Sequence, residues 1–172
     1  MEKTETNARI YVACLASYNN GILYGKWINA CQTVEELQDD VAEILKGSPI
    51  EDSEEWAIHD YEGFEGLRIS EYEGLESVSN LAHFIQEHGK LGAGVYNHCS
   101  DLEEAQTALE EQYIGEYESV SDFAREFTED NIPIPNELQY YIDYDAMARD
   151  MEATDVFTVE TAFQEVHIFW HH

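Results

Sequence analysis

The sequence predicts an α+β fold with an N-terminal antiparallel sheet and one helix, a helical middle, and C-terminal helices with short antiparallel strands. Three observations predict this class. Runs of β-branched and aromatic residues lie near both ends of the chain, apolar residues recur at helical spacing between them, and capping residues precede the helical segments.

The N-terminal sheet is predicted from three β-rich runs. Residues 9–15 (RIYVACL) and 22–28 (ILYGKWI) flank the segment Ser17-Tyr18-Asn19-Asn20-Gly21, and Asn-Gly between such runs is a strong hairpin signal. Residues 56–61 (WAIHDY) have the same β-rich composition. We therefore expect a hairpin and a third strand.

A helix over residues 34–46 is predicted by a capping box, Thr33 followed by Glu36, and is expected to end at Gly47. At 100° per residue the helix has an apolar inner face and an acidic outer face. The inner face would carry Val34, Leu37, Val41 and Leu45, and the outer face Glu35, Glu36, Asp39, Asp40 and Glu43. Like charges four residues apart each cost about 0.2–0.5 kcal/mol, so a sequence selected for stability alone would place lysine among them.

The middle of the chain is predicted to be helical. Gly63, Gly66 and Gly74 interrupt the chain after the third strand and indicate a domain boundary. The further predicted elements are helices over 78–88 (ending at Gly89), 101–113, 122–129 and 136–152, and strands over 156–159 and 163–170. We expect three small domains, residues 1–62, 63–115 and 116–172.

The helix over 101–113 repeats the two-faced design. Ser100 and Glu103 form its expected capping box, and Ser121 is the expected cap of the next helix. Its inner stripe would be Leu102, Ala105, Leu109 and Tyr113, and its outer acids Asp101, Glu103, Glu104, Glu110 and Glu111.

Net charge is the strongest functional signal in the sequence. The chain of 172 residues has 37 acidic and 8 basic residues, a net charge of -29. Solubility of a small domain needs a magnitude of only about 2–8. Because 44% of the residues are hydrophobic and 12% aromatic, the chain is expected to fold rather than remain disordered.

The charge and composition exclude several classes of function. The basic residues are isolated from one another, so no direct binding of nucleic acid is expected. No apolar stretch approaches the length of a membrane span, and three widely spaced cysteines suit reduced thiols, so we expect a cytoplasmic protein that does not bind membranes. Double-stranded DNA carries one charge per about 1.7 Å, so a net charge of -29 matches about 49 Å of duplex.

No enzymatic, metal or cofactor motif is predicted. The cluster of His167, His171 and His172 has spacing conceivable for a metal site, but His167 lies within a strand pattern and the other two are terminal. Cys99 beside His98 lacks a partner pair, and abundant acids make any carboxylate pair uninformative. We expect no catalytic residues, no metal and no cofactor. Charge and pattern leave open a shaped mimic of DNA, an acidic chaperone or buffer for basic proteins or cations, and a halophilic surface.

Three separated blocks of sequence resemble the ArdA antirestriction proteins of conjugative plasmids and transposons. These blocks are residues 10–27 (IYVACLASYNNGILYGKW), 56–62 (WAIHDYE) and 134–150 (IPNELQYYIDYDAMARD), and they occur in the family's order. The segment from 71 to 127 matches mainly in acidity and helical pattern.

The resemblance implies an elongated, dimeric mimic of DNA that occupies the DNA-binding groove of type I restriction-modification enzymes and competes with DNA. The phosphate-mimicking acids expected to contact the enzyme are Glu35, Glu36, Asp39, Asp40, Glu43, Asp60, Glu62, Asp101, Glu103, Glu104, Glu110, Glu111, Glu118, Asp122, Glu126 and Glu129.

The family's C-terminal domain mediates dimerisation. Tyr140, Tyr141, Ile142 and Tyr144 are accordingly expected near the twofold axis or in the core beneath it. Acids within the matched blocks have an alternative role in local capping or in pairing with Arg149. These acids are Asp60, Glu62, Asp143 and Asp150.

Overall fold

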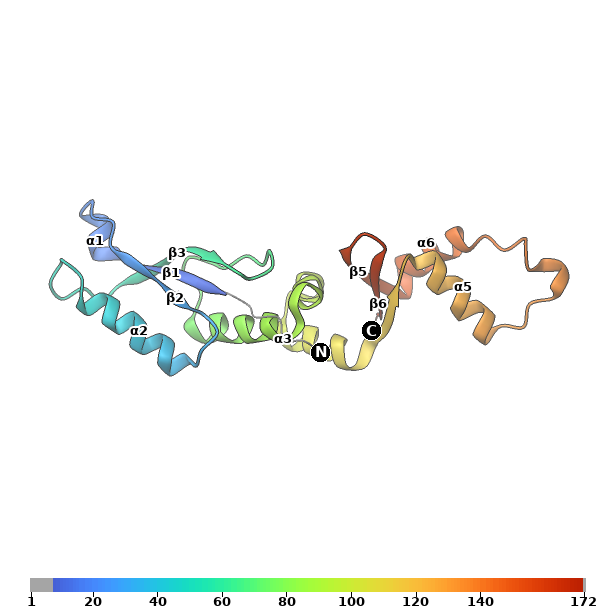
Figure 1. Cartoon of the computed structure of the whole chain (residues 1–172), viewed down its shortest axis with the longest axis horizontal. Helices are drawn as coiled ribbons and strands as arrows, with labels where there is room; N and C mark the ends of the chain where they lie inside the picture. The colour runs from blue at the N-terminus through green and yellow to red at the C-terminus, as the bar shows by residue number, and fades with distance from the viewer. Residues whose placement is uncertain (1–7, 172) are drawn as a thin grey trace. The chain divides into compact units, whose positions relative to one another are not determined.

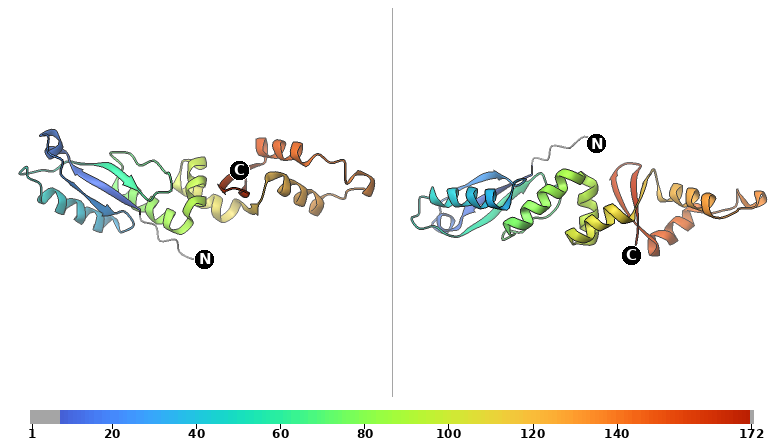
Figure 2. Two further views of the ribbon diagram at one scale, coloured as in Figure 1. Left: turned by 45° about the horizontal axis from the view of Figure 1, so that its top comes forward. Right: turned by 90° about the horizontal axis from the view of Figure 1, so that it is seen from below.

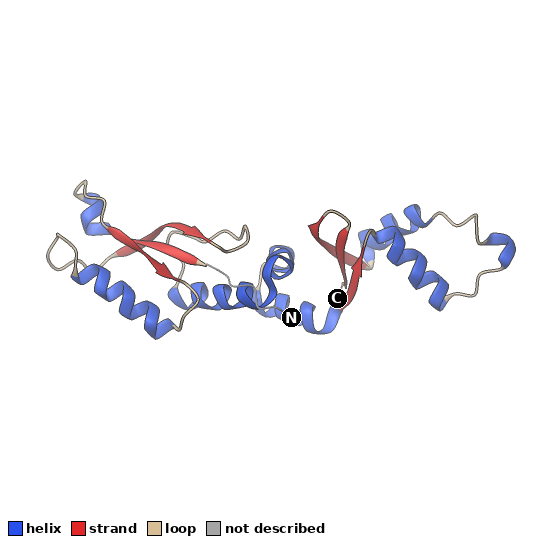
Figure 3. Ribbon diagram, in the orientation of Figure 1, coloured by secondary structure: helices blue, strands red, loops and turns tan. Residues whose placement is uncertain are grey.

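The computed structural model describes residues 8–171 and has the predicted α+β class (Figure 1). His172, one of the three terminal histidines, lies outside the described residues. The chain divides into two compact units after Ala93. Each unit contains one three-stranded antiparallel sheet together with helices (Figure 3). The division into three domains stays a prediction.

The first unit is built on the sheet β2-β1-β3, formed by β1 (Arg9–Cys14), β2 (Gly25–Asn29) and β3 (Trp56–Glu62). Strand β1 is central, with β2 and β3 paired on either side, and its residues Ile10, Val12, Ala13 and Cys14 are buried. The predicted hairpin and third strand are therefore confirmed. The connection contains the short helix α1 (Leu15–Asn19) before the turn at Asn20-Gly21, and β2 begins at Gly25, three residues later than predicted.

Helix α2 (Val34–Lys46) runs along the first sheet with the predicted bounds and cap (Figure 1). Thr33 Oγ1 accepts a hydrogen bond of 3.2 Å from the backbone N–H of Glu36. The buried face is Leu37, Val41 and Ile44, whereas Val34 and Leu45, both predicted on the inner face, are only partly buried.

Helix α3 (Leu75–Cys99) is longer than the predicted helix over 78–88. Gly89 interrupts it with φ 58° and ψ -141°, a conformation that glycine adopts without steric cost. The predicted end at Gly89 is thus a break between two helical segments. Within the described residues, no helix is both long and apolar enough to cross a membrane.

The second unit is built on the sheet β4-β6-β5, with β4 (Tyr113–Tyr117), β5 (Val156–Ala162) and β6 (Glu165–Trp170). Strand β6 is central, and side chains on both of its faces are buried. Helices α5 (Val120–Asn131) and α6 (Tyr144–Thr154) run side by side (Figure 2). On one face of the sheet, Ile168 joins a hydrophobic core with buried residues of both helices. On the other face Phe169 stacks on Phe157.

The predicted helix over 101–113 is partly wrong. It consists of α4 (Leu102–Thr107) and a π-helical turn, η1 (Ala108–Gln112), and Tyr113 already begins β4, which the sequence did not predict. The cap is Asp101, which accepts a hydrogen bond from the N–H of Glu104, and not Ser100, whose φ of 61° is incompatible with an extended cap residue.

Two further helix starts differ from the prediction. Ser119, not Ser121, caps α5 by accepting a hydrogen bond from the N–H of Asp122. The helix expected from Asn136 is a single 3-10 turn, η2 (Asn136–Leu138), and α6 begins only after Asp143, which caps it through the N–H of Ala146. The predicted strands near 156–159 and 163–170 are confirmed as β5 and β6.

Candidate functional site

The acidic side chains of the described residues lie at the protein surface. All are exposed except Asp40, Glu73 and Glu165, which are half-buried, and none is fully buried. The folded chain therefore directs its carboxylates into solvent, where a basic partner can reach them.

The α2 acids of the first unit, defined as Glu35, Glu36, Asp39, Asp40 and Glu43, lie opposite the buried residues of the helix. Glu35 and Glu36 occupy the first turn, where the helix dipole favours negative charge. Asp40 accepts a hydrogen bond of 2.7 Å from Gln32 Nε2, which fixes the direction of its carboxylate. The remaining acids of this group extend from the helix into solvent, and Asp39 lies three or four residues from each of the others.

The two acids of β3 have local partners. Glu62 forms an ion pair with Arg9, whose guanidinium also lies 4.7 Å from the centre of the Trp27 ring. Asp60 Oδ1 accepts a hydrogen bond of 2.8 Å from the N–H of Tyr61. The charge of Glu62 is therefore largely neutralised, whereas that of Asp60 is not.

The acids that begin the second unit's helical segment surround a surface hollow. Asp101, Glu103 and Glu104 line it, and its volume is about 760 Å³. Burial raises the pKa of the Cys99 thiol, and the charges of Glu104 and Asp101 raise it further. Glu110 and Glu111 follow in the π-helical turn and are exposed. These carboxylates together produce a strongly negative local potential.

The same hollow contains a pair of histidines. His98 stacks on Phe157 with ring centres 3.9 Å apart, and the ring of His171 lies 5.6 Å from His98. Burial lowers the pKa of His98, and the proximity of His171 lowers it further. Of the three terminal histidines considered from the sequence, His171 thus lies beside His98 and not beside His167.

A second acidic row follows α5. The α5 row consists of Asp122, Glu126 and Glu129, which are spaced by four and three residues, and Glu118 lies just before the cap Ser119; all four acids are exposed. With a rise of 1.5 Å per residue, four residues correspond to about 6 Å along a helix axis. Burial raises the pKa of Tyr117, and the charges of Glu126 and Asp130 add to the effect. This α5 row is an ordered line of negative charge.

Few basic groups compensate this charge. Within residues 8–171, the pair Arg9–Glu62 is the only ion pair between a lysine or arginine and a carboxylate. Arg125 lies instead over the ring of Tyr144, 5.2 Å from its centre. Arg149, proposed from the sequence as a partner for nearby acids, forms no ion pair with the carboxylates that the structure describes. Most carboxylates consequently retain their full charge toward a partner.

The four residues expected at the dimer interface separate into two groups by their exposure to solvent. Tyr140 and Tyr141 are 93% and 83% exposed, whereas Ile142 and Tyr144 are half-buried. Tyr144 packs against the core of the second unit, as the core alternative predicted for it. Tyr140, Ile142 and Tyr144 also line a hollow of about 650 Å³ beside the end of α5.

Comparison with known families identifies this acidic chain. A family model described as antirestriction protein (ArdA) matches residues 10–165. The chain belongs to the ArdA antirestriction family. The match includes all three blocks on which the resemblance was based, and it makes the chain an antirestriction protein, an inhibitor of restriction-modification rather than a known enzyme. No curated protein matches the chain significantly.

One group of side chains in this ArdA protein was missed by the sequence analysis. Glu116, Glu165 and His167 lie together on the second sheet. The group depends on strand β4. This strand was not predicted, because the apolar residues up to Tyr113 recur at helical spacing. The β-rich run of residues 113–117 (YIGEY) was the available signal.

Proposed function

We propose that this antirestriction protein is a DNA mimic whose surface carboxylates take the place of duplex phosphates. It competitively occupies the DNA-binding groove of type I restriction-modification enzymes. The observation that carries the proposal is the exposure of nearly all described carboxylates without basic partners. Family membership supplies the restriction system as the target.

The binding energy would come from basic residues that normally hold DNA. Lysine and arginine side chains in such a groove attract any ordered polyanion, and each contact releases counterions from both surfaces. The affinity is therefore expected to fall steeply as salt is added. Because many carboxylates share the interaction, no single one should dominate it.

A shaped mimic is favoured over an acidic buffer by the way the acids are held. The α2 acids project from a helix that is capped by Thr33 and packed through Leu37, Val41 and Ile44. A buffer or cation sponge needs carboxylates but no fixed spacing between them. Recognition by the DNA-binding groove of an enzyme would require rigid rows of carboxylates, spaced by about one helical turn.

The active form is proposed to be a homodimer that joins through the exposed tyrosines. Tyr140 and Tyr141 are large amphipathic side chains left in solvent by the folded monomer, and tyrosine is enriched at protein interfaces. A dimer doubles the length of DNA whose charge is matched, to about 98 Å at 1.7 Å per charge.

The proposal is tested by DNA cleavage with a purified type I enzyme and increasing amounts of this protein. Single changes to glutamine at Glu103, Glu104, Glu110 or Glu111 should alter the inhibitory concentration less than about twofold. The triple variant D122N/E126Q/E129Q of the α5 row should raise it at least tenfold at low salt, with an unchanged circular dichroism spectrum. Complete loss of inhibition in one single variant, or an unchanged inhibitory concentration in the triple variant at low salt, would refute distributed phosphate mimicry.

A further inference from the structure

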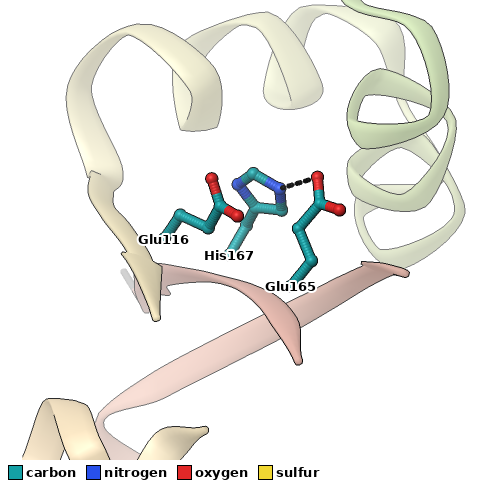
Figure 4. A group of neighbouring side chains, drawn as sticks. All are labelled: Glu116, Glu165 and His167. Carbon is teal, nitrogen blue, oxygen red and sulfur yellow. Dashed lines mark ion pairs between the residues drawn. The ribbon is translucent and has the colours of Figure 1, made fainter. Parts of the chain in front are cut away.

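A compact group of potential metal ligands lies on one face of the second sheet. His167 is on the central strand β6, Glu165 precedes it by two residues, and Glu116 of β4 is its direct partner in the antiparallel register. Side chains two apart on a strand, and partners in register, point to the same face. Figure 4 shows both carboxylates directed toward the imidazole ring.

The distances suit one ion with a small adjustment. One donor atom from each residue lies within 4.8 Å of the others, and Glu165 Oε1 is 4.0 Å from His167 Nε2. Two donors bound to one zinc ion at about 2.1 Å each can be at most about 4.2 Å apart. Glu116 is exposed on its strand, so rotation of its side chain can close the remaining distance.

The imidazole is already oriented as a ligand. His167 is only 8% exposed, and its Nδ1 lies 2.7 Å from the hydroxyl oxygen of Tyr113. A hydrogen bond from one ring nitrogen commonly orients the other toward a metal. The other ring nitrogen, Nε2, lies 3.1 Å from the hydroxyl oxygen of Thr161 and 4.0 Å from Glu165 Oε1, so an ion bound there would take the place of the Thr161 contact.

The two carboxylates lack another source of compensation. Among residues 8–171, no lysine or arginine forms an ion pair with Glu116 or Glu165, and His167 is the only ion-pair partner of Glu165. Two neighbouring carboxylates repel each other, and a divalent cation removes that repulsion. The ligand set of one imidazole and two carboxylates favours a first-row transition metal over Mg²⁺ or Ca²⁺, which prefer oxygen alone.

We propose that Glu116, Glu165 and His167 bind one divalent transition-metal ion, with zinc as the best-fitting candidate. Three protein ligands leave the fourth tetrahedral position for water. The ion would connect β4 to β6 and so stabilise the second unit. This proposal departs from the expectation of no metal, which rested on the spacing of the histidines, the lack of a partner pair for Cys99 and the abundance of acids.

The test is isothermal titration of the metal-stripped full chain with ZnCl₂ at pH 7.5, with MgCl₂ as a comparison. We expect one zinc ion per chain and at least 100-fold weaker magnesium binding. E116Q and E165Q should each weaken zinc binding at least tenfold, and H167Q should abolish it. Because E116Q and E165Q alter surface or half-buried carboxylates, they test the site even if H167Q fails to fold.

Two control variants separate this site from other sources of zinc binding. E160Q removes the same charge from β5 on the opposite face of the sheet, since Glu160 pairs with Val166 and not with His167. The double variant H98N/H171N removes the other pair of histidines, which lie next to each other. Both controls should bind zinc as the unmodified chain does. Equal magnesium and zinc affinities, wild-type zinc affinity in E116Q and E165Q, or loss of binding in H98N/H171N would overturn the proposal.

Discussion

Replacing Asp39 by lysine is expected to stabilise the protein, although the substitution removes one of its acidic groups. Asp39 lies in the middle of α2, four residues after Glu35 and four before Glu43, and all three side chains are exposed. The native helix therefore contains two like-charge pairs centred on this residue. In D39K both become pairs of opposite charge.

The expected gain follows from these two pairs. Each like-charge pair costs about 0.2–0.5 kcal/mol, and each opposite-charge pair contributes about the same amount in the favourable direction. D39K should therefore raise the free energy of unfolding by about 0.8–2 kcal/mol. D39N removes only the repulsion and should give about half of that gain, because asparagine and aspartate have similar helix propensities.

Urea denaturation followed by circular dichroism measures both variants, since urea leaves the ionic strength unchanged. The electrostatic part of the gain should shrink in 1 M NaCl, where the Debye length is about 3 Å, while the small gain from the helix propensity of lysine should persist. An order of stability other than D39K above D39N above the unmodified chain at low salt would refute the reasoning. So would a gain that is independent of salt.

Three further predictions concern the second unit. G94A should destabilise the second unit by about 1–3 kcal/mol in urea unfolding, because a Cβ at Gly94 would lie 2.2 Å from Val159 Cγ1. Adding V159A to the G94A chain removes this overlap and should recover much of the lost stability. The pKa of His98 is lowered by folding, so the unfolded chain binds more protons and the contribution of this group to stability should be lost as pH falls below about 6.5. H98F, which keeps a ring stacked on Phe157, should therefore lose less stability than the unmodified chain between pH 7 and pH 5. Parallel curves of stability against pH for the two proteins would contradict this. Y140D should shift the mass measured by light scattering from dimer to monomer without lowering the stability of the monomer, whereas an unchanged mass would exclude Tyr140 from the interface.

The parts of the fold that local sequence determines were predicted well. Helix α2 is the clearest case, because its cap at Thr33, its apolar spacing and its end at Gly47 are all encoded within a few residues. The acidic outer face of α2 followed from the same periodicity. Exposure of the predicted acids could be anticipated for that reason.

The parts that depend on distant partners could not be predicted. Strand β4 forms because it pairs with β6, and its first residue, Tyr113, also fits the helical spacing of the preceding segment. The ion pair between Arg9 and Glu62 joins two strands that are adjacent only in the folded sheet. Grouping of Glu116 with His167 required the same kind of long-range pairing.

Competition with DNA is the central claim, and displacement of a labelled duplex from a purified type I restriction-modification enzyme tests it most directly. Fluorescence anisotropy at low and at high salt would follow the release of DNA as this protein is added. The proposed mimicry predicts complete displacement, an apparent inhibition constant that rises in proportion to the DNA concentration, and marked weakening at high salt. Inhibition of cleavage while the duplex stays bound would contradict the account.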